Sequence, residues 1–407
     1  MSGRLFKMPD RPPPHTIPYN RGTTIHSPPM NLFSILIADQ PVGDPAALPP
    51  AIARNIASLR EHHPGLPHRL YDQDAIRDFL RTHMDRDVAW AYEQLMPYAY
   101  RADLARLCLL HEFGGLYADL SVFFHASLPL ASGKMIVFRD RAVVAPWIVS
   151  NTILGAPARA PALEAAIRMI VANCRNRYRG ASSLCPTGPV LLGKAIALHC
   201  EPGQIHLGEV SNLAQRSDTE ALAFVDATDG RLVGYRTKRG AGLQELGLEQ
   251  GVNNYNDFYY AHLTYAADYP VRVDADYIAR HGRTAAPLDG GQLAYPGAPA
   301  MHGDALDMVA LCHLPIPFAA GRYRVLLELA DGAAGAGLTL VALENGAGQA
   351  LARADHRLAG GAALPTLELD VASSRKDIVI GVFTASATQL RIAGLRIERP
   401  PQEQEQG

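Results

Sequence analysis

The chain has 407 residues, of which 48% are hydrophobic, 19% charged and 7% aromatic, a composition that supports folded cores and excludes wholesale disorder. Thirty-eight basic and forty acidic residues leave a formal net charge of -2, so no global cationic field exists to hold a phosphate backbone. A dedicated nucleic-acid-binding protein is therefore disfavoured. The five cysteines form no CxxC pair and no zinc-site spacing, which predicts reduced, mostly buried thiols.

The first thirty residues are rich in proline and lack the apolar core of a signal peptide. They predict an extended N-terminal arm, which we assign to residues 1–22. No apolar run approaches the roughly 20 residues needed to cross a bilayer. We therefore expect an intracellular protein.

From about residue 31, short apolar runs alternate with amphipathic stretches, a pattern that predicts an α/β domain over residues 23–285. The expected elements in chain order are a strand at 31–39, a helix at 51–62, a strand at 68–71, a helix following Asp74, and further helix and strand signals at 161–174 and 188–200.

The most regular stretch lies at residues 98–124. Apolar positions at helical spacing predict a helix that ends at Gly114–Gly115, since glycine favours the left-handed stop. A strand is expected to follow directly, from Leu116 to Phe124, with Asp119 three residues inside it beside Tyr117.

After about residue 290 the pattern changes to short strand-like runs separated by turns rich in glycine, alanine and aspartate. The runs lie at 322–330, 337–345, 365–372, 376–384 and 389–398. Their spacing predicts a β-sandwich or jelly roll over residues 290–399, followed by a disordered polar tail at 400–407.

Chemistry-bearing motifs are few. The chain has no GxxxxGK[ST] loop, GxSxG elbow, HExxH helix or strand-linked GxGxxG. What remains is Asp119, because ligands of α/β sheets collect at the carboxyl ends of strands, where a carboxylate can meet a nucleotide and its divalent cation. The residues alone leave an alternative open, in which Gly114–Gly115 is only a helix cap and Asp119 a turn residue.

The run YRADLARLCLLHEFGGLYADLSV resembles the signature of the DXD-motif sugar transferases, which have a Rossmann-like GT-A fold. Three other pieces resemble the same family: a TIH triplet at Thr24–His26, Asn151–Thr152, and a TGP triplet at Thr187–Pro189. The resemblance is specific over residues 98–124, loose over about 20–265, and does not cover the C-terminal β region.

This resemblance implies a donor site for a nucleotide-diphosphate sugar. It gives Asp119 and Arg106 the catalytic roles, with Asp119 as the first acid of DXD. The donor-binding residues that it implies are Arg101, Asp103, Arg106, Tyr117, Asp119 and Asn151, with Tyr117 stacking near the base or ribose. The alternative for Asp103 and Arg106 is a structural salt bridge between residues three apart on one helix.

The resemblance also implies Mn²⁺ or Mg²⁺, with Asp119, Ser121 and His262 as the ligands. Here the second acid of DXD is replaced by Ser121, a poorer ligand for a hard cation. Three outcomes stay open: Ser121 acts through water, the enzyme works without a tight metal, or it no longer catalyses.

The polar and aromatic run at 251–270 is the best source of compensating ligands. Its candidate oxygen ligands are Asn253, Asn254, Asn256 and Asp257. Its candidates for stacking on a sugar are Tyr255, Tyr259, Tyr260 and Tyr265. The alternative is a polar turn followed by an aromatic strand that packs on the core.

We therefore expect a glycosyltransferase that moves a sugar from a UDP- or GDP-sugar to a glycan or glycolipid in bacterial surface polysaccharide or lipopolysaccharide synthesis. It would be cytoplasmic, with peripheral contact to the inner membrane as an option. The alternative is a degenerate protein that binds nucleotide sugar or glycan without turnover, and a glycoside hydrolase is a weaker third class.

For the C-terminal β region, an interaction or stability module is favoured over a glycan-binding one. In the glycan-binding alternative, the residues that face the ligand would be Tyr295, His302 and Tyr323.

Overall fold

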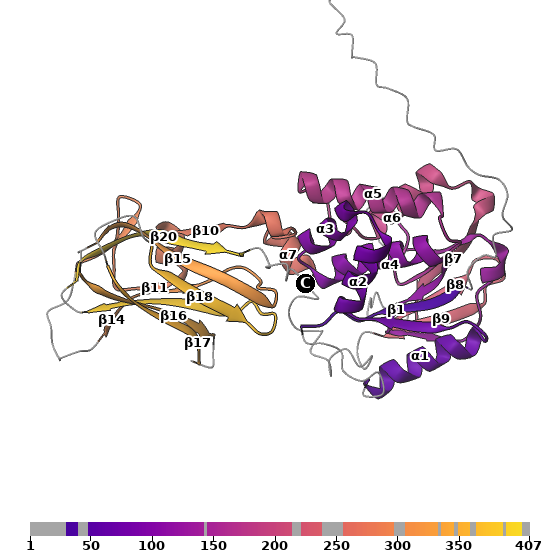
Figure 1. The fold of residues 1–407 in the computed structure, drawn as a ribbon, viewed down its shortest axis with the longest axis horizontal. Helices are drawn as coiled ribbons and strands as arrows, with labels where there is room; N and C mark the ends of the chain where they lie inside the picture. Colours follow the sequence, from indigo (N-terminus) through magenta and orange to yellow (C-terminus); the bar gives the residue numbers. More distant parts are fainter. Residues whose placement is uncertain are drawn as a thin grey trace, which may run out of the picture.

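The computed structural model describes residues 30–39, 48–141, 145–213, 221–237, 255–296, 306–332, 335–345, 349–358, 364–385 and 388–400. An α/β unit is followed by a unit of antiparallel sheets, indigo to magenta and orange to yellow in Figure 1. The predicted fold class is confirmed. The expected arm, Thr24–His26 and residues 401–407 lie outside the described residues.

The α/β unit is built on a nine-stranded sheet of order β2-β1-β3-β6-β5-β7-β8-β9-β4. β1 pairs in parallel with both β2 and β3, whereas β4 pairs antiparallel with β9 at one edge. The strands are β1 (Asn31–Ile35), β2 (His68–Tyr71), β3 (Gly115–Ala118), β4 (Val122–Phe124), β5 (Met135–Arg139), β6 (Ile153–Ala156), β7 (Ile205–Asn212), β8 (Ala221–Asp226) and β9 (Leu232–Thr237).

Helices cover both faces of this sheet, with α1 on one side and α4 to α6 on the other (Figure 1). Side chains alternate along each strand, so Leu32 and Leu116 pack in the cluster of α1, while Phe33 and Tyr117 pack with α4. The helices are α1 (Pro50–His62), α2 (Gln73–His83), α3 (Arg86–Gln94), α4 (Tyr98–Phe113), α5 (Pro161–Asn176), α6 (Pro189–His199), α7 (Tyr255–Tyr260) and α8 (Ala275–His281).

The expected end of α4 is confirmed. Gly114 caps the helix with a φ of 65° and donates its N–H to Leu110 O at 2.8 Å. Gly115 follows with a φ of 113°, and a Cβ at this position would collide with the carbonyl oxygen of Asn31 in β1. Glycine is therefore required here both for its conformation and for the close approach of β3 to β1.

The strand expected at 116–124 is in fact two strands. The chain turns after β3, with the Val122 N–H donating to Asp119 O at 3.1 Å. Leu120 is buried within this turn, and its carbonyl accepts from the Asn55 amide of α1 at 2.8 Å. β4 then pairs with β9, so Asp119 stands at the carboxyl end of β3 rather than inside a strand.

The second unit is a sandwich of two antiparallel sheets. Its core is formed by inward-facing apolar residues such as Val325 and Leu395 of one sheet and Leu340 and Ile380 of the other. The strands are β10 (Val271–Asp274), β11 (Arg283–Thr284), β12 (Leu288–Asp289), β13 (Gln292–Tyr295), β14 (Leu306–His313), β15 (Gly321–Gly332), β16 (Gly337–Glu344), β17 (Ala350–Arg357), β18 (Thr366–Val371), β19 (Ile378–Ala385) and β20 (Leu390–Glu398).

The sandwich begins earlier in the chain than the expected boundary near residue 285. β10 pairs with β20 over Val271–Asp274, and β11 pairs with β14 at Arg283 and Thr284. Helix α8 lies between these two strands and buries Ala275 and Ile278. Residues 271–284 therefore belong with the sheets that follow them.

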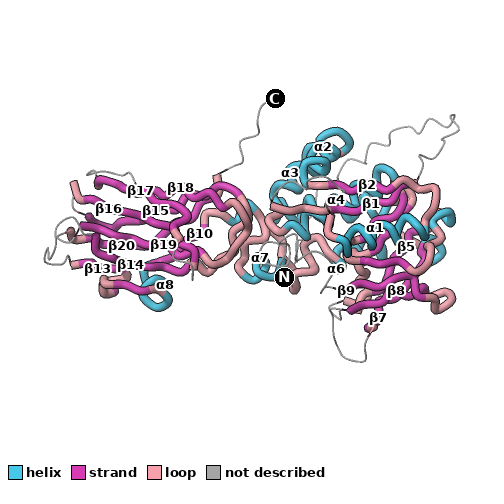
Figure 2. The backbone as a smooth tube through the Cα atoms, turned by 90° about the horizontal axis from the view of Figure 1, so that it is seen from below, coloured by secondary structure: helices cyan, strands magenta, loops and turns pink. Residues whose placement is uncertain are grey.

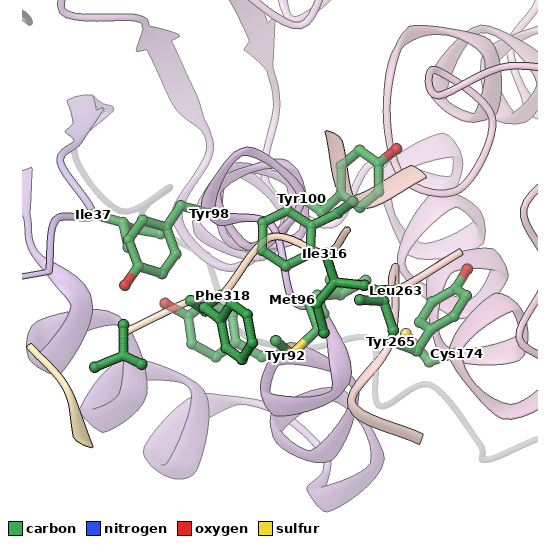
Figure 3. Packing of buried hydrophobic residues seen from close by; sticks show 14 of the residues in the cluster. Ile37, Tyr92, Met96, Tyr98, Tyr100, Cys174, Leu263, Tyr265, Ile316 and Phe318 are labelled. Atoms are coloured by element: carbon green, nitrogen blue, oxygen red, sulfur yellow. The ribbon is translucent and has the colours of Figure 1, made fainter. Parts of the chain in front are cut away.

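The two units contact each other near α7 (Figure 2). Ile316 and Phe318 of the sandwich unit lie with Met96 and Tyr98 in one apolar cluster (Figure 3). Asp39, just after β1, accepts hydrogen bonds from other elements: Tyr98 Oη at 2.6 Å, Ser374 N at 2.8 Å and Ser374 Oγ at 2.7 Å. The sandwich therefore docks at the carboxyl edge of the parallel strands.

Two predictions about the whole chain concern membranes and cysteines. No helix in the described ranges is long and apolar enough to cross a membrane. All five cysteines are unpaired, and Cys108, Cys174 and Cys312 are buried. The expectation of free, mostly buried thiols is confirmed.

Candidate functional site

Asp119 lies where three elements meet. It follows β3, which runs parallel to β1, so the ends of both strands face the same edge of the sheet. Its backbone N–H donates to Thr152 O at 2.9 Å. This bond fixes the backbone of Asp119, while its side chain is 27% exposed, so part of it faces solvent.

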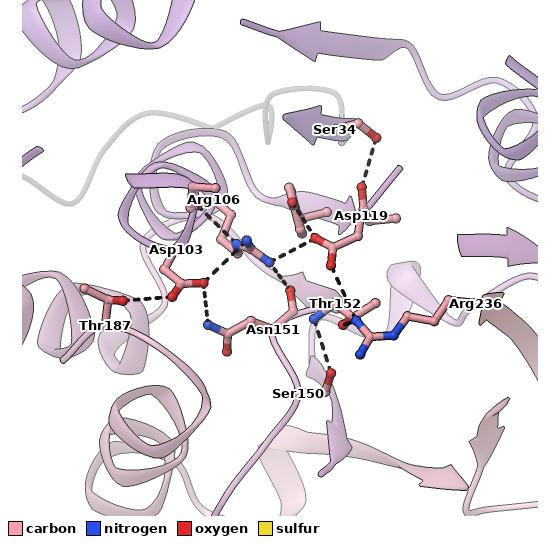
Figure 4. A network of polar contacts seen from close by, with 12 residues as sticks. Ser34, Asp103, Arg106, Asp119, Ser150, Asn151, Thr152, Thr187 and Arg236 are labelled. Atoms are coloured by element: carbon pink, nitrogen blue, oxygen red, sulfur yellow. Dashed lines mark hydrogen bonds and ion pairs between the residues drawn. The ribbon is translucent and has the colours of Figure 1, made fainter. Parts of the chain in front are cut away.

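Arg106 of α4 is the buried partner of Asp119 (Figure 4). Its Nη1 donates to Asp119 Oδ1 at 3.1 Å and to the Asn151 carbonyl, and its Nε donates to Ala102 O at 3.1 Å. Burial works against the charge, but Tyr117, Asp119 and Asp103 more than offset this and raise the pKa of the guanidinium. Arg106 is therefore a fixed cation that orients Asp119.

Asp103 connects the motifs that resemble the sugar transferases. Its Oδ1 accepts from Asn151 Nδ2 at 2.9 Å, its Oδ2 accepts from Thr187 Oγ1 at 2.8 Å, and Arg106 lies 3.4 Å away (Figure 4). Burial raises the pKa of Asp103, against the opposing effect of Arg106 and the two hydrogen bonds. Residues from three separate segments, at 103–106, 151 and 187, thus converge on one buried carboxylate.

Tyr117 has a different role from the one expected. Its ring is only 2% exposed and lies under the Arg106 guanidinium, 4.4 Å from the ring centroid. Its hydroxyl donates to Asp119 Oδ1 at 2.7 Å. The ring is therefore not available to stack on a base or ribose, and Tyr117 instead fixes the orientation of Asp119.

Arg236 of β9 is a site residue that the sequence analysis missed. The antiparallel register pairs Arg236 with Val122, three residues beyond Asp119. Its Nη1 donates to Thr152 Oγ1 at 3.0 Å and lies 4.0 Å from Asp119 Oδ2. No local signal in the sequence could have identified it, because its place depends on pairing between distant strands.

Arg101, which was expected to bind the donor, points away from this site. It is buried, donates from Nε to Leu95 O at 2.7 Å, and lies over the rings of Tyr92 and Tyr98. Two positions on a helix separate Arg101 from Asp103 by about 200° around the axis. The expectation is corrected accordingly: Arg101 packs on Tyr92 and Tyr98, rings that lie in the same apolar cluster as Phe318 of the sandwich unit.

His262 is exposed at the end of α7 and has a left-handed φ of 58°. Its carbonyl accepts from Arg179 Nη2 at 2.8 Å, and no hydrogen bond or ion pair among the described residues links its ring to Asp119. Among the described residues, the contact of His262 is therefore made by its backbone and not by its ring.

The aromatic run around α7 mostly packs within the protein. Tyr265 is fully buried, Tyr255 stacks on Tyr100 with 5.7 Å between ring centroids, and Tyr259 donates to Gly180 O at 2.9 Å. Tyr260 is 74% exposed. Burial raises the pKa of Tyr255. The negative charge of Asp103 adds to this increase and the positive charge of Arg236 opposes it, so the charges of the site act on this phenol.

Two of the four polar residues of the run have described contacts, and the other two lie outside the described residues. Asp257 lies 3.3 Å from the Lys376 ammonium of the sandwich unit, and Asn256 accepts from Ser183 Oγ at 2.6 Å. Asn253 and Asn254 lie outside the described residues.

The described residues fit a divalent cation poorly. DXD transferases typically use one, but here Asp119 Oδ1 already accepts from Arg106 and Tyr117, and Oδ2 faces the Arg236 guanidinium. Ser121 adds no charge, and within the described ranges no three His, Cys, Asp or Glu side chains gather in a metal-binding group. A carboxylate that already faces two guanidinium groups is suited to accept hydrogen bonds from hydroxyl groups, and the guanidinium groups are suited to anions. Neither arrangement suits a hard cation.

Residues 49–141 match the family model described as "Glycosyltransferase sugar-binding region containing DXD motif". An inositol phosphoceramide mannosyltransferase 3 of Schizosaccharomyces pombe is 29% identical over 135 residues, 32% of this chain and 36% of that protein. An uncharacterized glycosyltransferase, L373, of Acanthamoeba polyphaga mimivirus is 29% identical over 79 residues, 18% of this chain and 32% of its own length. The chain therefore spans about a third of these curated relatives.

Among solved structures, the PaToxG glycosyltransferase aligns over 42% of this chain and 70% of its own, with 16% identity and a TM-score of 0.32. The family match covers α4, β3 and Asp119, and it ends before Asn151 and Thr187.

Proposed function

We propose that the protein transfers a glycosyl group from a nucleotide-diphosphate sugar to an acceptor hydroxyl, because residues 49–141 match the model of the sugar-binding region of DXD-motif glycosyltransferases. The donor we propose is a UDP- or GDP-sugar. It would bind at the carboxyl edge of β1 and β3, with Asp119 and Arg106 as the catalytic pair.

The convergence on Asp103 supports this proposal most directly. Asp103 and Arg106 lie inside the family match, whereas Asn151 and Thr187 lie beyond it, yet all four are joined by hydrogen bonds and an ion pair. A solitary salt bridge within one helix would not gather two further segments. The arrangement holds Oδ1 of Asp119 with two hydrogen bonds and leaves Oδ2 beside Arg236, in a side chain that is 27% exposed.

In such a reaction the bond between the anomeric carbon and the phosphate oxygen breaks, and the leaving nucleoside diphosphate gains negative charge. Fixed cationic donors near that position lower the barrier without reorganising. We propose that Asp119 Oδ2 accepts a hydrogen bond from the donor sugar, and that Arg106 keeps the carboxylate in that orientation. Asp103, Asn151 and Tyr117 act as positioning residues.

The acceptor we propose is a glycan or glycolipid of the kind built into bacterial surface polysaccharide or lipopolysaccharide, used in the cytoplasm or at the inner membrane surface. The name of the fission-yeast relative, an enzyme of inositol phosphoceramide, supports testing lipid-linked acceptors. For the sandwich unit we propose a supporting role, since Tyr295 and Tyr323 are buried and His302 lies outside the described residues.

A donor panel tests the proposal. The purified protein is incubated with UDP-, GDP- and dTDP-sugars, GDP-mannose among them, with and without glycan or glycolipid acceptors, and release of nucleoside diphosphate is followed. We expect release from one donor class that increases when an acceptor is present.

The second candidate is a degenerate protein that binds the nucleotide sugar without turnover, which Ser121 in place of the second acid favours. Tight donor binding by calorimetry, with no release of nucleoside diphosphate under any condition, would support that candidate and contradict the first.

A further inference from the structure

Two guanidinium groups flank the Asp119 carboxylate, and only one of them belongs to the expected motif. Arg106 lies on the buried side, with 7% of its side chain exposed, and Arg236 lies on the open side, with 23% exposed. The Asp119 side chain between them is 27% exposed. Of these three described side chains, the carboxylate and Arg236 are therefore the more exposed ones.

Most N–H donors of the Arg236 guanidinium have no acceptor among the described residues. A guanidinium has five N–H donors, and within the described part of the chain only Nη1 has an acceptor, Thr152 Oγ1 at 3.0 Å. Its Nε is buried and has no hydrogen-bond partner among the described residues. A planar cation with unused donors at a partly exposed position is suited to bind phosphate oxygens.

The charges at this site differ from those of a motif with two acids. A motif with two acids carries two negative charges, which a divalent cation neutralises. Here Ser121 removes one of those charges, and Arg236 adds one positive charge 4.0 Å from the remaining carboxylate oxygen. A cation bound at Asp119 Oδ2 would lie within a few ångströms of the guanidinium, where like charges repel each other.

We propose that the Arg236 guanidinium takes the place of the divalent cation and binds the diphosphate of the donor, so that transfer does not require a metal. This inference rests on the proposed glycosyltransferase function. In the step, the bond between the anomeric carbon and the β-phosphate oxygen breaks, and its electron pair leaves with the phosphate. The anomeric carbon forms a new bond to the acceptor oxygen, whose proton is released to water.

The test combines binding and turnover in the full-length protein. Calorimetry measures binding of UDP and GDP in EDTA, and a coupled assay measures nucleoside diphosphate release in EDTA and in Mn²⁺. The variants are Arg236→Met, Arg236→Lys, and Arg231→Met as a matched control. Arg231 comes directly before the first residue of β9, whereas Arg236 lies near the last one. It forms ion pairs with Asp226 and Asp229, so it is a charged arginine of the same hairpin that lies away from the site.

We expect wild-type protein to bind nucleoside diphosphate in EDTA and to turn over at the same rate, within about twofold, whether or not Mn²⁺ is present. Arg236→Met should lower the turnover rate by about 100-fold or more, the effect of losing one fixed donor to a developing anion. Arg236→Lys should keep part of the activity, since it retains the charge but loses the planar fork. Arg231→Met should behave as wild type.

Other outcomes separate the inference from the proposed function. If EDTA abolishes wild-type turnover, or if Arg236→Met and Arg236→Lys both bind and react as wild type does, the inference is overturned while glycosyl transfer stands. If no donor is cleaved but metal-free nucleotide binding depends on Arg236, the transferase proposal fails, and with it the claim of metal-free transfer, while the role of Arg236 in binding the diphosphate stands. Circular dichroism checks each fold, and Arg236→Lys decides if Arg236→Met does not fold.

Discussion

At the scale of single residues, Asp103 is a buried carboxylate with three partners on three segments. Asn151 Nδ2 and Thr187 Oγ1 lie within 2.9 Å of its oxygens, and Arg106 lies 3.4 Å away. Removing this carboxylate leaves the Arg106 charge buried with fewer partners, a change that is strongly destabilising in protein interiors.

Asp103→Ala is therefore expected to lower the free energy of unfolding by about 3 kcal/mol or more. Thr187→Val is the comparison, because it removes one hydrogen bond and should cost only about 1 kcal/mol. Urea denaturation followed by circular dichroism measures both. Equal losses in the two variants would contradict the central position of Asp103.

The sequence was informative about this network because its residues belong to local motifs. Asp103, Arg106 and Asp119 are related by helix and turn spacing, so the resemblance could name them together, and the structure joins them by ion pairs. Arg236 could not be found in the same way, because it reaches the site through the pairing of β9 with β4. Tyr117 was found but misread, since the packing of Arg106 over its ring is a property of the folded chain.

At the scale of elements, the approach of β3 to β1 depends on Gly115. Its φ of 113° is unfavourable for other residues, and a Cβ would collide with Asn31 O. Gly65 offers a matched control, because its φ of 79° is also positive but a Cβ there would meet open space.

Gly65→Ala is expected to cost about 1 kcal/mol of stability from backbone strain alone. Gly115→Ala should cost several times as much, since a steric clash with β1 is added to the strain. Thermal unfolding of the two variants provides the comparison. Similar melting temperatures for both would show that β1 and β3 are not held as closely as described.

β2 contributes a pH-dependent term through His68, whose Nε2 lies 3.3 Å from Ser34 Oγ of β1. Burial, helped by the positive charge of Arg60, lowers the pKa of His68 to about 4. In the unfolded chain its pKa is near 6.5. Between these values the unfolded state binds a proton that the folded state does not, so stability is lost as the pH falls.

We expect the free energy of unfolding to decrease between pH 6.5 and 4, with His68 contributing up to about 1.4 kcal/mol per pH unit. His68→Gln should remove this part of the slope, whereas His199→Gln, at an exposed position at the end of α6, should not. Urea titrations at several pH values decide the matter. An unchanged slope in His68→Gln would refute the assignment.

Element boundaries show where sequence patterns reach their limit. The apolar run at 116–124 predicted one strand, because periodicity alone does not reveal the turn that Asp119 and Val122 close. Likewise the short strand β10 carries little pattern of its own, and its place in the sandwich follows from pairing with β20. The longer strands β15, β16, β18, β19 and β20 were anticipated, since their apolar alternation extends over several residues.

At the scale of the whole molecule, the two units share a buried contact. Phe318 is fully buried and lies with Met96 and Tyr98 of the α/β unit, next to the hydrogen bonds of Asp39 with Ser374. This contact lies at the carboxyl edge of the parallel strands, the same edge of the sheet at which Asp119 follows β3.

Phe318→Ala is expected to uncouple the units and to split a single calorimetric transition into two, with a loss of about 3 kcal/mol or more at the contact. Leu340→Ala, in the core of the sandwich, is the control: it should lower the transition temperature of the sandwich without affecting the contact. A single transition in Phe318→Ala would mean that the units do not depend on this residue for their cooperation.

The central claim is that donor chemistry takes place at Asp119. The most direct test is the initial rate of nucleoside diphosphate release from the preferred sugar donor, measured for wild type and Asp119→Asn. Asp229→Asn, at an exposed turn before β9, is the control. We predict that Asp119→Asn lowers the rate by about 100-fold or more while the control reacts as wild type. Release by Asp119→Asn at the wild-type rate would contradict the account.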